Sequence, residues 1–131
     1  MKFPFARVLS VTIATIIVYQ SALVAPAINI ALEVKPAAIL LRFIWPIFFA
    51  LVGTLGLIGM IVSWKQKTGL RVNLATAVSM LICYLLVPVI NGAMDNDQMG
   101  LWKSLHITTV ALTFVTLILH LVYVFRRSKR V

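Results

Sequence analysis

Charged residues are scarce in this chain, and acidic ones are scarcer still. Only 11% of the 131 residues are charged, whereas 62% are hydrophobic. A soluble domain of this size would lack the polar surface needed to cover itself. Only three residues are acidic, and no charged residue falls well inside an apolar stretch. A proton-coupled exporter needs an acid embedded in the membrane, so this absence argues against that class of transporter.

Cysteine and the common catalytic motifs are also missing. Cys83 is the only cysteine, so no disulfide can form within the chain. There is no phosphate-binding glycine loop, no serine nucleophile motif and no His-Glu-x-x-His zinc motif, which excludes conventional hydrolase and nucleotide chemistry. No basic segment is interleaved with stacking aromatics, so nucleic acid is not an expected partner.

Apolar stretches dominate what remains. They run from about Val8 to Ala25, Phe43 to Trp64, Val72 to Asn91 and Trp102 to Phe125. Each is close to the ~20 residues that a membrane-spanning helix needs. The first is too long for the apolar region of a cleaved signal peptide. We therefore predict an all-α integral membrane protein, with residues 1–131 forming a single domain, a four-transmembrane-helix bundle.

Basic residues favour one side of these spans. That side carries Lys2, Arg7, Lys65, Lys67, Arg71, Arg126, Arg127, Lys129 and Arg130, and the other only Lys35, Arg42 and Lys103. By the positive-inside rule, we expect the N- and C-termini to be cytoplasmic. We expect the membrane to be a bacterial inner membrane. The basic C-terminal cluster is expected to contact the anionic head groups of the lipid bilayer. The acidic residues Glu33, Asp95 and Asp97 fall in the opposite loops.

An internal repeat relates the two halves of the chain. Pro26 and Asn29, near the end of the first predicted helix, match Pro88 and Asn91 near the end of the third. The alignment predicts two tandem helical hairpins, repeat 1 at about 7–67 and repeat 2 at about 71–128. Two copies inserted with the same orientation would be related by a pseudo-two-fold axis along the membrane normal.

Polar residues recur at helical spacing along the last predicted helix. The stripe consists of His106, Thr109, Thr113, Thr116 and His120. These steps of three and four put the residues on one face of a helix, which should turn from lipid toward the protein interior. Similar spacings in the first and third helices predict partner residues, namely Thr12, Thr15 and Tyr19, and Thr76, Ser79 and Cys83. In the second helix, Gly53, Gly56 and Gly59 would let another backbone approach closely.

The two histidines could also serve electron transfer. His106 and His120 lie about 21 Å apart along a helix, too far to share one metal. With partners from a homo-oligomer or another subunit they could ligate two haems, one near each membrane face. Apart from this haem-binding alternative, the sequence predicts no cofactor and no metal site.

The elements around the second Pro-x-x-Asn resemble a known pattern. Pro26 with Asn29, the run 87–95 and the run 101–106 resemble a four-helix membrane family that includes the fungal anthrone oxygenases. The resemblance implies cofactor-independent oxidation of polycyclic anthrones by oxygen. By position it makes Asn91, Trp102 and His106 the candidate site residues.

Two classes of function stay open. One is an accessory or structural subunit within a larger membrane complex. The other is an enzyme for an apolar aromatic substrate, in which His106 acts as general base and Asn29 and Asn91 orient the anion. His106 should then matter more than His120, because it lies near the outer loops, where Asp95 or Asp97 could support it.

Overall fold

The computed structural model describes residues 5–128, which form helices joined by short turns. The elements are α1 (Phe5–Val18), the π-helix η1 (Tyr19–Val24), α2 (Ala25–Ala31), α3 (Val34–Val62), α4 (Lys67–Asp95) and α5 (Met99–Ser128). Because α1, η1 and α2 are continuous, the described residues contain four helices long and apolar enough to cross a membrane. The prediction of an all-α four-helix bundle is confirmed. Of the basic residues discussed above, Lys2, Lys129 and Arg130 lie outside the described residues.

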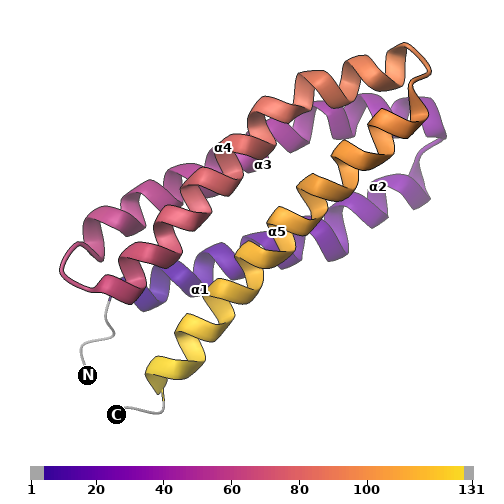
Figure 1. Ribbon diagram of the computed structural model, residues 1–131. Coiled ribbons are helices and arrows are strands. Elements are labelled where there is room, and N and C mark those ends of the chain that lie inside the picture. Colours follow the sequence, from indigo (N-terminus) through magenta and orange to yellow (C-terminus); the bar gives the residue numbers. More distant parts are fainter. Residues whose placement is uncertain (1–4, 129–131) are drawn as a thin grey trace.

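The four spans form a ring in chain order. α1 packs against α3 and α5, and α4 packs against the same two helices (Figure 1). The start of α1, the end of α5 and the α3–α4 turn lie at one end, called here the terminal end. The α2–α3 and α4–α5 turns lie at the other, the distal end. Large apolar side chains such as Phe43, Leu85 and Phe114 are exposed on the outside, as expected for a surface that faces lipid.

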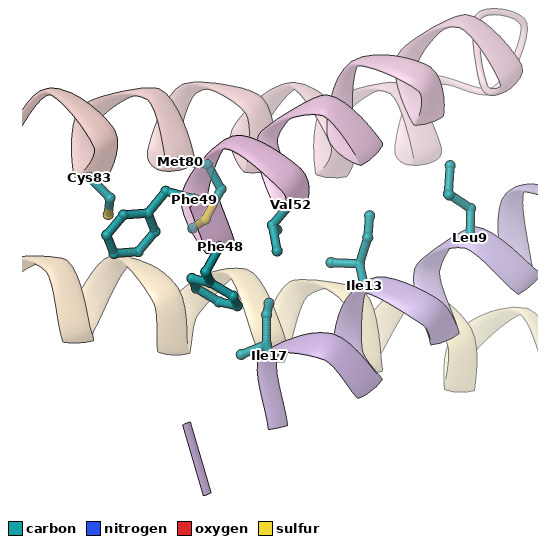
Figure 2. Close-up of a cluster of buried hydrophobic side chains, with 8 residues drawn as sticks. All are labelled: Leu9, Ile13, Ile17, Phe48, Phe49, Val52, Met80 and Cys83. Carbon is teal, nitrogen blue, oxygen red and sulfur yellow. The ribbon is translucent and has the colours of Figure 1, made fainter. Parts of the chain in front are cut away.

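An apolar cluster fills the middle of the bundle (Figure 2). Ile13 and Ile17 of α1 point toward Phe48 and Val52 of α3. The cluster consists of Leu9, Ile13, Ile17, Phe48, Phe49, Val52, Met80 and Cys83. These residues pack α3 against α1 on one side and against α4 on the other.

Glycines of α3 form its seam with α4. A Cβ built on Gly59 would collide with the amide of Asn73, and one on Gly56 would lie 3.1 Å from the backbone N of Ala77. Gly53 would meet Met80 at 3.3 Å. The glycine face therefore lets α4 approach closely, as the spacing predicted.

Helix boundaries at the distal end differ from the sequence expectation. α3 begins at Val34 instead of near Phe43, because the extended backbone of Glu33 ends the turn and Pro36 fits within a first helical turn. The first span likewise continues beyond Ala25 to Ala31. Both additions lengthen the walls of the distal half.

A compact turn joins α4 to α5. Asp97 has a left-handed backbone with φ 55°. Its N–H donates to Met94 O at 3.2 Å, and the N–H of Gln98 donates to Ala93 O at 2.8 Å. This pair of bonds is the Schellman pattern that closes a helix C-terminus. The turn holds Asp95, the last residue of α4, at the distal end.

Candidate functional site

A cavity of about 630 Å³ lies in the distal half of the bundle. All four spans line it, and most of its wall is apolar. The four candidate residues from the sequence, Asn29, Asn91, Trp102 and His106, all lie in this wall. Residues far apart in the chain are therefore brought around one space.

The cavity reaches the outer surface between two elements. Val18 and Ala22 on one side, and Val110 and Phe114 on the other, line the cavity and are also exposed. The first pair belongs to α1 and η1, and the second to the middle of α5. Because this edge lies at mid-helix level, the opening faces the region that lipid would occupy.

Prolines shape the cavity wall. The residue preceding Pro26, Pro46 and Pro88 lines the cavity in each case, namely Ala25, Trp45 and Val87. A proline inside a helix donates no backbone hydrogen bond, and its ring clashes with the carbonyl four residues earlier. η1 comes directly before α2, where the N–H of Ala25 donates to Gln20 O, five residues back. The wider π turn relieves the clash that Pro26 would cause in a regular α-helix.

His106 lies against the indole of Trp102. The two rings are nearly parallel, with an angle of 7° and centroids 5.2 Å apart. Both residues come from the first turns of α5, one turn apart, so the helix itself sets this stacking. The His106 side chain is exposed and lines the cavity, which leaves its ring nitrogens accessible to a bound molecule.

The two matched asparagines present amide groups to the same space. Nδ2 of Asn29 donates to Ala25 O at 2.9 Å, which holds the side chain along α2 and leaves its amide oxygen and second N–H available. Asn91 lies within α4, one turn after Pro88, and does not cap the end of the helix.

Sequence reasoning missed Arg42 as a cavity residue. Its guanidinium forms an ion pair with Asp95, at 2.6 Å from Nη2 to Oδ1 and 3.2 Å from Nη1 to Oδ2. The predicted apolar span begins at Phe43, so Arg42 falls among the charges that flank the spans and not among the residues facing the interior. Asp95, considered above as a support for His106, instead pairs with this arginine. Opposite charges flanking the two distal turns were the available signal.

The polar stripe of α5 faces inward, as predicted. Thr109 and Thr113 are buried and line the cavity, and Thr116 and His120 are buried below it, toward the terminal end. Nε2 of His120 lies 2.8 Å from Oγ1 of Thr76. Tyr123, one turn further, donates to Gln66 at 3.2 Å. The full burial of His120 within one chain does not favour a haem shared with a second chain.

The polar stripe predicted in α4 lies inside the bundle, whereas the one predicted in α1 does not. Thr76 and Cys83 are buried in α4, where Asn73 and Met80 complete the same face. The prediction for the first helix was wrong, since Thr12, Thr15 and Tyr19 are exposed. The inner face of α1 is instead built from Leu9, Ser10, Ile13 and Ile17. Thr12 satisfies its hydroxyl on its own helix, at Val8 O.

Metal ligands do not cluster in the part of the chain that the structure describes. No group of three or more His, Cys, Asp or Glu side chains there could hold a metal ion. No family model, curated protein or solved structure matches the chain.

Proposed function

We propose that the protein binds an apolar, ring-containing small molecule in the distal cavity and that His106 acts on it as general base. The observation that carries this proposal is the convergence of His106, Trp102, Asn29 and Asn91 on one cavity of about 630 Å³. Cavities of roughly 300–1,000 Å³, lined by apolar walls with a few polar groups, are typical of small-molecule sites. An accessory subunit that only packs against partners has no need of such a space.

The proposed chemistry is that of an anthrone oxygenase-like enzyme. His106 takes a proton from an activated CH₂ group between two aromatic rings, and the electron pair is delocalised onto the ring system and its carbonyl oxygen. Amide N–H groups of Asn29 and Asn91 donate to that oxygen. Molecular oxygen then adds to the carbanion, the peroxide formed takes up a proton, and loss of water leaves a ketone. One O₂ is consumed, the CH₂ becomes C=O, and one water is released.

Anthrone is a direct probe of this proposal. The purified protein in lipid nanodiscs is mixed with anthrone, while oxygen uptake and the absorbance of anthraquinone are recorded. We expect turnover above that of empty nanodiscs. His106→Ala should remove it, and Thr108→Val should retain it, because Thr108 is exposed on the same helix and bonds only Ser104 O.

Binding is measured separately from turnover. Trp45 and Trp102 line the cavity, so their fluorescence should be quenched by an anthrone-sized ligand in a saturable way. Saturable binding without turnover would overturn the general-base assignment. Absence of saturable binding would overturn the whole proposal and favour an accessory role.

We also propose an orientation for the protein in the membrane. The basic bias supports a bacterial inner-membrane protein whose terminal end faces the cytoplasm. Cysteines introduced at Lys65 and Gln98, in the α3–α4 and α4–α5 turns, would report the two sides, since native Cys83 is buried. A residue-98 cysteine that reacts only with reagents on the cytoplasmic side would overturn this orientation.

We also propose that the two helical hairpins are a tandem repeat. Asn29 and Asn91, which the alignment matches, line the same cavity, and this supports two related hairpins that contribute equivalent groups to one site. On this view the first copy supplies an amide, and the second supplies an amide and the histidine.

A further inference from the structure

Arg42 stands apart from the rest of the cavity wall. Among the described residues that line the cavity, it is the only one with a permanent charge. Its side chain is 35% exposed, and it projects from α3 near the distal end. The remaining polar groups of the wall are amides, hydroxyls, two indoles and an imidazole. Any ionised group on a ligand in this cavity would therefore interact chiefly with Arg42.

The ion pair with Asp95 leaves part of the guanidinium available. The two hydrogen bonds to Asp95 use two of the five N–H donors of an arginine. Asp95 is 58% exposed, so water can solvate its carboxylate when the pair opens. Such an exposed pair contributes only about 0–1 kcal/mol to stability, and a ligand carboxylate in the less polar cavity can compete with it.

We propose that the natural ligand is an acidic amphiphile, an apolar ring system that carries one ionised carboxylate or phenolate, and that Arg42 determines this specificity. Asp95 is the competing anion that Arg42 releases, wholly or in part, when the ligand binds. This inference rests on the proposed function only in using the same cavity. The apolar body lies among the aliphatic and aromatic side chains, and the acidic group lies at the distal end.

A matched pair of probes tests the charge preference. Anthracene-9-carboxylate and 9-anthracenemethanol share one ring system and differ in charge. Each is titrated into protein in nanodiscs of neutral phosphatidylcholine, with empty nanodiscs as the correction for partitioning. We expect the carboxylate to bind about tenfold more tightly, the size of effect that one charge-assisted hydrogen bond gives.

Variants of the ion pair should act in opposite directions. Arg42→Gln should remove the preference for the carboxylate and leave the affinity for the alcohol unchanged. Asp95→Asn should raise the affinity for the carboxylate several-fold, because the competing anion is gone. Asp97→Asn and Lys103→Gln change charges at the same end but do not line the cavity, and they should change neither affinity. Arg42→Lys keeps the charge and should keep part of the preference.

The outcomes separate this inference from the proposed function. If the alcohol shows no saturable binding to the wild-type protein, the proposed function itself fails. If both probes bind equally and no variant separates them, only the assignment of Arg42 fails. Equal weakening of both probes by Arg42→Gln would show a structural role and also overturn the assignment. Anionic phospholipid is the remaining source of an acidic group: if phosphatidylglycerol nanodiscs abolish carboxylate binding in an Arg42-dependent way, the site is a lipid site.

Discussion

Thr76 accepts a hydrogen bond from His120 across the α4–α5 interface. The Thr76 hydroxyl donates its own proton to Val72 O at 3.0 Å, so the 2.8 Å contact with Nε2 of His120 needs the proton on the imidazole. A neutral His120 then carries a bare lone pair on Nδ1, and that atom is buried with no partner among the described residues. The hydrogen bond to Thr76 therefore fixes His120 in the tautomer that carries its proton on Nε2.

Removing both partners of this pair should cost less than the sum of removing each one alone. Thr76→Val leaves a buried N–H without an acceptor, and we expect the free energy of unfolding to fall by about 1–3 kcal/mol. The double variant with His120→Leu also removes the unpaired Nδ1, so its loss should be much smaller than the sum of the single losses. Unfolding in detergent by heat or denaturant measures all three variants. Strictly additive losses would contradict the assigned hydrogen bond.

The two histidines should differ in what they affect. His106 is exposed in the cavity wall, so His106→Ala should abolish activity while the protein stays folded. His120 is 0% exposed, so His120→Ala should lower stability and spare most of the activity per folded molecule. Thermal unfolding and anthrone turnover, measured on the same samples, separate these effects. Equal loss of activity from both variants, together with a lost Soret band, would instead support the two-haem alternative.

Glycine substitutions should test how closely α3 packs on α4. Gly59→Ala places a methyl group against the buried amide of Asn73, and we expect a loss of about 1–3 kcal/mol in unfolding free energy. Gly92→Ala is the control, because nothing lies within 4 Å of its added Cβ. Within a helix, that change should stabilise by about 0.5–1 kcal/mol. A neutral Gly59→Ala would show that the helices can separate at little cost.

The α4–α5 turn offers a stabilising change. Asp97 holds φ at 55°, where a side chain is strained and glycine is not. Asp97→Gly should therefore raise the unfolding free energy by up to about 1 kcal/mol, and Asp97→Val should lower it. Thermal unfolding of the two variants beside the wild type tests the sign. If Asp97→Gly lowers stability, a contact of the carboxylate must outweigh the backbone strain.

Hydropathy and spacing predicted the number of spans and the inward stripe of α5, because both follow from burying apolar or polar faces at a period of 3.6 residues. The predicted helix boundaries were wrong where polar residues lie inside a helix. Arg42 and Lys35 read as loop residues in a hydropathy scan, yet they lie in the first turns of α3. At the distal end the helices continue past the apolar runs.

The spacing of polar residues alone could not show which of the three polar stripes face the interior of the bundle. The stripe of α5 faces inward, whereas in α1 the apolar side chains of Leu9, Ile13 and Ile17 take the inner face and the threonines lie outside. Serine and threonine satisfy their hydroxyls on their own helix, so exposure of Thr12 and Thr15 costs little and leaves no signal in the sequence. Asn73 is one turn before Thr76, and its burial depends on Gly59, which is distant in the chain.

The wide turn of η1 also has a kinetic consequence. α2, which follows η1, contains no buried residue. Its main packing partners are α3 and η1. Segments with few buried contacts open locally at low free energy, so amide hydrogens of α2 should exchange with deuterium sooner than those of α3 or α4. Since Asn29 and Ala25 of α2 form one wall of the cavity, we expect the same fluctuation to set how fast a molecule dissolved in the bilayer reaches His106. Arrival and departure would then depend on bilayer thickness and fluidity as much as on affinity.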